Sequence, residues 1–228
     1  MAMAMIRVDH NKGVPLNDRV TCRHLTESKF NLEMTRILSM QKNPLRRQLL
    51  EHREQMPQDD RRAAEKRIAD TLSAKAVTQG WSQIAVFLPW RGEPDLMSTW
   101  KAWHARGMLL ALPVVVSRDA PLVMQLWHPG ESMIRDAMGL QVPAAAKVLA
   151  CDTWLIPCVG VDRLGGRLGA GKGFYDRTIA ATPVPWPRLV GVCFDHALHD
   201  GVFSEPHDLQ LDACVTESGW RDFRNRSA

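Results

Sequence analysis

Residues 153–181 read TWLIPCVGVDRLGGRLGAGKGFYDRTIAA and show the clearest change of pattern in this chain of 228 residues. The apolar run at 153–159 predicts a buried strand, and residues 173–181 predict a helix. Five glycines fall within the nine residues 165–173. A glycine-rich loop lets backbone N–H groups approach phosphate oxygens, and a helix that follows it directs its positive end toward the same place. The stretch therefore predicts an α/β fold with an anion site at the loop.

Residues 166–172 also match the GxxxxGK pattern of a P-loop. However, Gly173 stands where a P-loop has Ser or Thr to hold magnesium, so we do not expect a true P-loop. If a nucleoside triphosphate binds here, its metal must be held by another group, and Asp176 offers a hard oxygen ligand one turn into the helix. The alternative is a glycine-rich turn that carries a solvated Lys172.

Short apolar runs alternate with helical stretches around this loop. Further strands are predicted at 84–88, 108–116, 122–127, 189–194 and 211–216. Helices are predicted after an N-cap at Asn43, from a cap at Asp59 or Asp60 to about Val77, and over 96–106. This alternation favours a three-layer, Rossmann-like α/β sandwich with a central, mostly parallel sheet and helices on both faces.

The domain organisation follows from where this patterning begins. Residues 1–39 show no sustained period of 3.6 or 2, so we interpret them as a poorly ordered N-terminal extension. No long Gly/Ser linker divides the remainder, and residues 40–228 are therefore expected to form one domain.

Composition limits the class of protein. The chain has 29 Lys and Arg against 25 Asp and Glu, a net charge of +4 that suits phosphate-bearing ligands without requiring a nucleic acid. Its five cysteines are an odd number without a CxxC pair, which argues against a disulfide framework. No apolar run approaches the roughly 18 residues of a membrane span, and the N-terminal region lacks a secretory signal. We expect a cytoplasmic protein without membrane or nucleic-acid partners.

Residues 167–176, RLGAGKGFYD, resemble the signature of the 5-formyltetrahydrofolate cyclo-ligases, also called 5,10-methenyltetrahydrofolate synthetases. The resemblance extends from about Lys42 to Glu217, through FLPWRGEPD at 87–95, PCVGVD at 157–162 and LDACVTE at 211–217. It implies an enzyme that uses ATP and Mg²⁺ to convert the small molecule 5-formyltetrahydrofolate to 5,10-methenyltetrahydrofolate, and we expect this enzyme to be a monomer. ADP and phosphate would be released through a phosphorylated formyl intermediate.

The resemblance also implies which residues bind ATP. Lys42 and Arg46 match a basic pair that contacts the phosphates, and their i,i+4 spacing can place both on one helix face. Arg167 and Lys172 match catalytic cations, and Lys172 is best placed to neutralise charge that grows on the transferred group. The rest of the matching phosphate cradle comprises Gly169, Gly171, Gly173, Phe174 and Tyr175.

For folate and metal, the resemblance implies a second set of residues. Glu93 matches the acidic residue that recognises folate, because a carboxylate can accept hydrogen bonds from neighbouring N–H groups of a pterin. Leu88, Trp90 and Tyr175 would contact the ring, with core packing as the alternative for each of them. Asp176 and Asp212 match two magnesium-binding carboxylates. They lie 36 residues apart, so only the fold could bring them together.

The chain departs from the family pattern at two positions, and two other functions are alternatives to the cyclo-ligase activity. Ala170 stands where some relatives have arginine, and Phe174 where others have tyrosine; both changes bear on affinity more than on identity. A non-catalytic folate- or nucleotide-binding paralogue is the first alternative. The second is nucleic-acid binding through the basic residues of 46–67, although acidic residues are interleaved with them.

Overall fold

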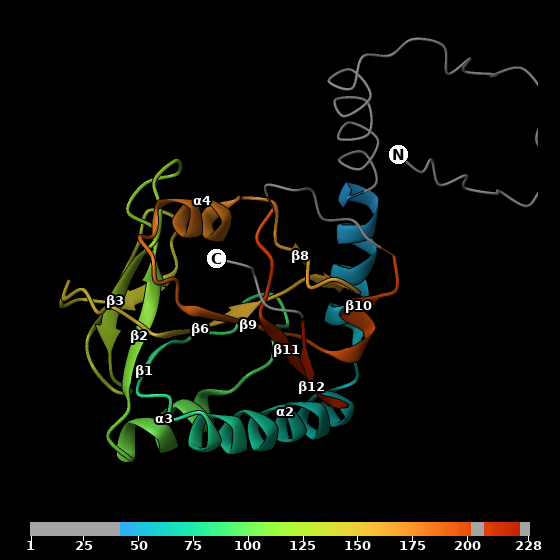
Figure 1. Cartoon of the computed structure of the whole chain (residues 1–228), viewed down its shortest axis with the longest axis horizontal. Coiled ribbons are helices and arrows are strands. Elements are labelled where there is room, and N and C mark those ends of the chain that lie inside the picture. The colour runs from blue at the N-terminus through green and yellow to red at the C-terminus, as the bar shows by residue number, and fades with distance from the viewer. Residues whose placement is uncertain (1–41, 202–207, 224–228) are drawn as a thin grey trace, which may run out of the picture.

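A seven-stranded sheet forms the centre of the computed structural model, which describes residues 42–201 and 208–223 (Figure 1). The strand order is β12-β11-β9-β6-β1-β2-β3. The bounds are β1 Gln83–Ala85, β2 Leu109–Val114, β3 Val123–Trp127, β6 Thr153–Pro157, β9 Arg188–Val192, β11 Ala213–Thr216 and β12 Gly219–Asp222. The inner strands pair in parallel, whereas the edge strands β3 and β12 are antiparallel to their neighbours. The proposed extension, residues 1–39, lies outside the described residues.

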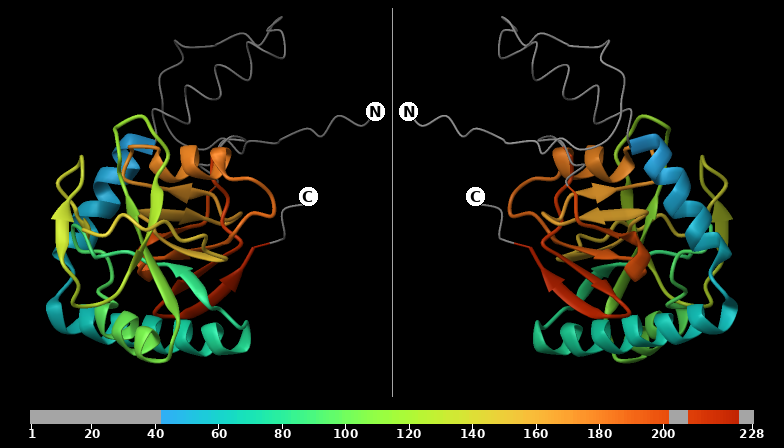
Figure 2. Two further views of the ribbon diagram at one scale, coloured as in Figure 1. Left: turned by 90° about the vertical axis from the view of Figure 1, so that its left-hand side faces the viewer. Right: turned by 90° about the vertical axis from the view of Figure 1, so that its right-hand side faces the viewer.

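Helices cover both faces of this sheet. Helices α2 (Gln58–Thr78) and α3 (Met97–Ala105) lie along one face, and α4 (Phe174–Ala181) lies on the other (Figures 1 and 2). Residues 42–55 are also helical and pack near a small sheet of β10 (Leu198–His199), β7 (Gly160–Asp162) and β8 (Arg167–Leu168). A hairpin of β4 (Met133–Arg135) and β5 (Gln141–Pro143) and a 3₁₀ turn at Asp195–Ala197 complete the described elements. The expected three-layer α/β sandwich is confirmed.

Strand alternation divides the core between the two faces. Ile84 and Val86 join the buried cluster under α2 and α3, while Ala85 between them joins the cluster on the opposite side. This follows from the two-residue period of a strand. On the helical side, α2 contributes Ile68 and Leu72, both without exposed surface.

Two predicted helix caps are wrong. Helix α2 begins at Gln58 after Pro57, so Asp59 and Asp60 lie in its first turn, where their negative charge still favours the helix N-terminus. Residue 42 is already helical. The side chain of Asn43 accepts a hydrogen bond from Nη1 of Arg46 at 2.5 Å instead of capping that helix.

Strand order places a crevice at the carboxyl ends of β1 and β6. The chain continues from β1 to β2 on one side of β1, and later returns to β6 on the other side. Ligands of open α/β sheets bind where the strand order reverses in this way.

Within the described part of the chain, no helix is long and apolar enough to cross a membrane.

Candidate active site

A cleft of about 790 Å³ opens at this reversal point. Its lining includes the cations Lys42, Arg46, Arg167 and Lys172, the acids Glu93, Asp176 and Asp208, and apolar side chains that include Leu88, Trp90, Leu112, Met138 and Leu140. Basic residues and the glycine-rich loop thus line the same cleft as Glu93 and these apolar side chains. The cleft therefore combines groups suited to an anion with groups suited to an organic ring.

The glycine-rich loop between β8 and α4 needs its glycines. Gly171 and Gly173 have φ angles of +89° and +65°, in the left-handed region that side chains disfavour. At Gly169, an added Cβ would lie 2.6 Å from Nη1 of Arg167. Gly173 is also the residue that precedes α4. All three glycines line the cleft, so the backbone of the loop is accessible to a ligand there.

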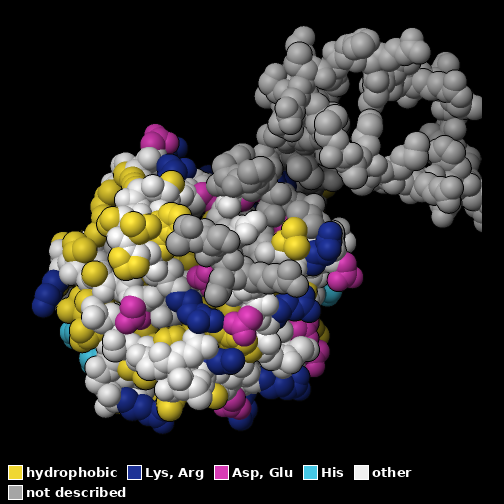
Figure 3. Space-filling model, in the orientation of Figure 1, with side chains coloured by type: hydrophobic (Ala, Val, Ile, Leu, Met, Phe, Trp, Pro, Cys, Tyr) yellow, Lys and Arg dark blue, Asp and Glu magenta, His cyan; other side chains and the backbone are white. Residues whose placement is uncertain are grey.

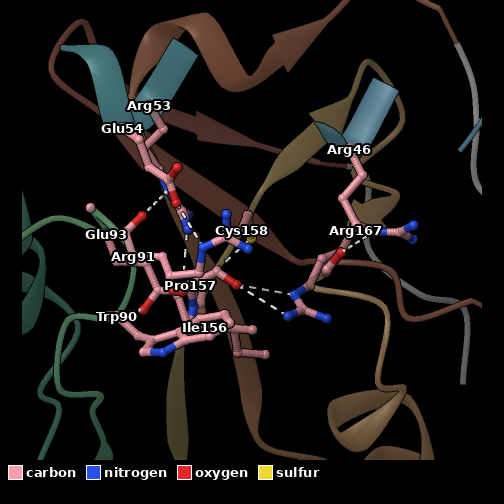
Figure 4. Close-up of polar contacts among 12 residues, drawn as sticks. Arg46, Arg53, Glu54, Trp90, Arg91, Glu93, Ile156, Pro157, Cys158 and Arg167 are labelled. Atoms are coloured by element: carbon pink, nitrogen blue, oxygen red, sulfur yellow. Dashed lines mark hydrogen bonds and ion pairs between the residues drawn. The ribbon is translucent and has the colours of Figure 1, made fainter. Parts of the chain in front are cut away.

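Two arginines tie this loop to its surroundings, Arg46 to the helical residues 42–55 and Arg167 to the end of β6 (Figure 4). Nε of Arg46 donates to the carbonyl of Gly169 at 2.8 Å. Nε and Nη2 of Arg167 donate to the carbonyl of Pro157 at 3.3 and 3.1 Å. Burial, and then the charge of Arg167, lower the pKa of Arg46. The fold thus holds two guanidinium groups of like charge close together, an arrangement that a bound anion would stabilise.

The remaining expected phosphate-binding residues also reach the cleft. Lys42 forms a 2.5 Å ion pair with Asp208, and Lys172 is exposed in the lining. Tyr175 lies beneath Arg167, whose guanidinium carbon is 4.9 Å from the ring centroid, and burial raises the pKa of Tyr175. Phe174 packs in the same way against Arg177, at 5.1 Å.

The structure does not bring Asp212 to the cleft. Oδ2 of Asp212 accepts a hydrogen bond from the backbone N–H of Leu189 at 2.7 Å, and its own N–H donates to the carbonyl of Leu189 at 2.9 Å. These contacts hold Asp212 where β9 and β11 begin, whereas the cleft lies at the other ends of the parallel strands. Asp212 is therefore absent from the cleft lining, which includes Asp176.

Asp208 instead lines the cleft with Asp176. Oδ1 of Asp176 accepts a hydrogen bond from the N–H of Leu209 at 3.2 Å, which fixes α4 against the segment that carries Asp208. Sequence reasoning missed Asp208, although it lies only four residues before Asp212 in the same segment. In the described residues, no group of three or more His, Cys, Asp or Glu side chains could hold a metal ion alone. Two carboxylates nevertheless suit Mg²⁺, which commonly binds through one or two carboxylates together with phosphate oxygens.

Glu93 is presented by a tight turn after β1. Arg91 and Gly92 have φ angles of +47° and +76°, and the N–H of Glu93 donates to the carbonyl of Trp90 at 3.1 Å. In return, Oε2 of Glu93 accepts a hydrogen bond from the N–H of Trp90 at 3.1 Å. Trp90 is 45% exposed, so it is not a core residue, and Leu88 is half-buried beside it in the cleft lining.

Burial dominates the electrostatics of Glu93. It raises the pKa of this carboxyl to about 7, against the opposing effects of Arg53, the N–H of Trp90 and Arg167. A carboxylate poised near neutrality in a partly apolar cleft is typical of functional sites.

Residues 138–141 form a wall of the cleft that sequence reasoning missed. They comprise the end of the turn between β4 and β5 and the first residue of β5, and Asp136 anchors this turn. Its carboxylate accepts hydrogen bonds from the N–H groups of Val115, Met138 and Leu140 at 3.1, 2.8 and 3.0 Å. The strands of this hairpin are only three residues long, too short to give a periodic pattern.

Comparisons with known proteins agree with one another. A family model described as "5-formyltetrahydrofolate cyclo-ligase family" matches residues 38–217. The 5-formyltetrahydrofolate cyclo-ligase of Mycolicibacterium smegmatis is 29% identical over 187 residues, which cover 77% of this chain and 93% of the relative. The Escherichia coli K12 protein of the same name is 30% identical over 141 residues, 59% of this chain and 78% of the relative.

Solved structures share the fold. The NMR structure of Aquifex aeolicus 5,10-methenyltetrahydrofolate synthetase has a TM-score of 0.70 at 24% identity, covering 82% of this chain and 95% of that one. The 5,10-methenyltetrahydrofolate synthetase from Mycoplasma pneumoniae has a TM-score of 0.61 at 22% identity, covering 77% and 98%.

Proposed function

Because the chain belongs to the 5-formyltetrahydrofolate cyclo-ligase family, we propose that it converts 5-formyltetrahydrofolate to 5,10-methenyltetrahydrofolate with MgATP as the second substrate. The observation that supports this most directly is the composition of the cleft. A basic, glycine-rich phosphate site and an acidic, partly apolar site line the same cavity. Such a cavity can hold a nucleotide and a reduced folate together.

The proposed reaction has two steps. First, the formyl oxygen attacks the γ-phosphorus of ATP, the bond to the bridging oxygen breaks, and ADP leaves. Second, N10 of the folate attacks the activated formyl carbon and loses its proton, while the carbon–oxygen bond breaks and phosphate departs. Phosphorylation converts a poor leaving oxygen into a good one. The protein must therefore chiefly position the reactants and neutralise charge.

The cations of the cleft fit the first step. Lys42, Arg46 and the backbone N–H groups of residues 169–173 would bind the phosphates. Arg167 and Lys172 would stabilise the charge that develops on the transferred phosphoryl group. Arg46 and Arg167 are already held by backbone carbonyls, so little reorganisation is needed when the phosphates bind.

Asp176 and Asp208 would hold Mg²⁺ against those phosphates. When bound, the ion would neutralise phosphate oxygens and leave the γ-phosphorus more open to attack. Asp208 already pairs with Lys42, so one of these carboxylates lies beside a proposed phosphate-binding cation.

The other part of the cleft would hold the folate. Glu93 would accept adjacent N–H groups of the pterin, and Leu88, Trp90 and Tyr175 would pack against the ring. Each of these side chains lines the cleft.

Nucleic-acid binding receives less support. Arg46 faces the cleft, and Arg53 and Arg61 donate to backbone carbonyls of residues 91 and 92. On the face shown in Figure 3, Lys and Arg side chains are interspersed with Asp and Glu. No single basic surface is evident on that face.

We propose a cytoplasmic location, since the four described cysteines are free thiols. We also propose that the protein is a monomer, since one chain supplies all the proposed binding residues.

The decisive experiment is the near-ultraviolet absorbance of methenyltetrahydrofolate. Purified protein is mixed with 5-formyltetrahydrofolate, Mg²⁺ and ATP, with ATP omitted in the control. We expect an absorbance rise that requires ATP. Folded protein that binds both ligands without a rise would instead be the non-catalytic paralogue, and the proposed function would be wrong.

A further inference from the structure

A buried arginine lies behind the carboxylate proposed to recognise folate. Arg53 comes from the helical residues 42–55, and its side chain is only 4% exposed. Nε of Arg53 donates to the carbonyl of Arg91 at 3.0 Å, inside the turn that presents Glu93 (Figure 4). Arg61 of α2 donates to the next carbonyl, that of Gly92, and to the carbonyl of Arg53. Two arginines therefore hold the turn from behind.

One nitrogen of Arg53 is directed toward Glu93 without a hydrogen bond. Nη1 lies 3.9 Å from Oε1 of Glu93, which is itself 11% exposed. This distance is too long for a hydrogen bond but short enough for an ion pair. Among the described residues, no hydrogen-bond acceptor satisfies this buried nitrogen. A buried cation in this position is costly unless a negative charge lies beside it.

We propose that Arg53 is a positioning residue that keeps Glu93 ionised and directed into the folate part of the cleft. The inference rests on the proposed function, because Glu93 is expected to act on folate. Arg53 does not line the cleft, so it would act only through Glu93.

The groups around Glu93 make Arg53 the main support of its charge. Arg53 and Arg167 both favour the carboxylate, and Arg53 has the larger effect on its pKa. Tyr175 and Cys158 also face this site, and burial raises the pKa of each, that of Cys158 to about 11. These two groups therefore stay neutral near pH 7. Because the pKa of Glu93 is already about 7, loss of Arg53 would leave this carboxyl mostly protonated at neutral pH.

The affinity for folate should rise with pH. Folate recognition needs the carboxylate, so affinity is present above the pKa of Glu93 and is lost as pH falls through it. In the native protein this transition is expected near pH 7. Removal of a facing cation raises the pKa of a carboxyl by about one unit or more. Arg53→Met should therefore weaken folate binding about fivefold or more at pH 7 and restore it at pH 9.

Calorimetric titration of the full-length protein with 5-formyltetrahydrofolate between pH 6 and 9 tests this. Arg53→Met removes the charge, Arg53→Lys retains a charge, and Arg47→Met is the matched control on an exposed face of the same helix. Glu93→Gln should abolish the transition. Titration with MgATP at pH 7 should give the same affinity in the Arg53 variants as in the native protein. If Arg53→Met does not fold, Arg53→Gln, which keeps a donor for the carbonyl of Arg91, takes its place.

The outcomes separate the two proposals. A transition moved to higher pH in Arg53→Met, and near its native position in Arg53→Lys and Arg47→Met, supports the role of Arg53. An equal loss of folate affinity at every pH, with no movement of the transition, means that Arg53 is only structural and overturns the inference. Failure of the native protein to bind 5-formyltetrahydrofolate overturns the proposed function, and the inference with it.

Discussion

Lys172 is exposed, whereas the other three cations of the cleft are half-buried. Arg46 and Arg167 are tied to carbonyls of residues 169 and 157, and Lys42 is paired with Asp208. Lys172 is exposed, on a loop rather than in the core. In the proposed reaction, an exposed ammonium on a flexible stem would adjust more readily than an anchored guanidinium to a phosphoryl group that moves from ADP to the formyl oxygen.

Lys172→Ala should therefore reduce turnover about 10²–10³-fold, the usual effect of removing one group that stabilises transition-state charge. The free energy of unfolding should change by less than about 0.5 kcal/mol, because an exposed side chain is removed. Steady-state kinetics and denaturant unfolding measure the two effects. Lys101→Ala, at an exposed position on α3, is the control and should change neither. Native turnover in Lys172→Ala would remove Lys172 from the mechanism.

Single residues also show how far sequence reasoning reaches at the site. The glycine-rich loop predicts an anion site from its own residues, and the family resemblance adds Lys42, Arg46 and Glu93 to the same proposed site; all of them line the cleft. The choice between Asp208 and Asp212 could not be made in that way. Both are aspartates near the start of β11, and only the hydrogen bonds between Asp212 and Leu189 show which one is held away from the cleft.

At the scale of elements, α2 stabilises the sheet without lining the cleft. Leu72 has no exposed surface and belongs to the cluster that includes Ile84 and Leu110. Val77, near the end of the same helix, is 68% exposed. These two positions on one helix allow core packing to be separated from catalysis.

Leu72→Ala should lower the free energy of unfolding by about 2–5 kcal/mol, through lost burial and the cavity that remains. Val77→Ala should change it by less than about 0.5 kcal/mol. Because neither residue lines the cleft, kcat per folded molecule should stay at its native value in both variants. Urea denaturation monitored by circular dichroism, with kinetics on the same samples, checks this. A large loss of kcat in folded Leu72→Ala would contradict the separation.

The predictability of the elements depended on their length. Helix α2 and strands β2, β6 and β9 show clear apolar patterns, because each buries a face over five or more residues. Strands β7, β8 and β10 have only two or three residues. Such short strands form because tertiary pairing holds them, for example Val161 with Leu198. Local sequence carries no periodic pattern at that length.

At the scale of the molecule, the proposed ATP site joins three parts of the chain: the helical residues 42–55, the loop at 167–173 and the segment at Asp208. A ligand that binds only this folded arrangement must stabilise the whole domain. At a hundred times its dissociation constant, the gain is about 2.7 kcal/mol.

Saturating MgATP should accordingly raise Tm by about 5–10 °C, as expected for a domain of this size. Scanning calorimetry with MgATP, with Mg²⁺ alone and without ligand measures the shift. Mg²⁺ alone should have little effect, because two carboxylates make a weak site without phosphate. An unchanged Tm at millimolar MgATP would show that the cleft does not take the nucleotide.

The ion pair between Lys42 and Asp208 joins residues that the ribosome synthesises far apart in time. Its two residues are 166 positions apart. At about 5–20 residues per second, roughly 8–30 seconds separate the synthesis of the first residue from that of the second. During that interval the nascent chain carries its basic helix without its acidic partner. The proposed nucleotide site is thus completed only once Asp208 has been synthesised, after strands β1, β2, β3, β6 and β9.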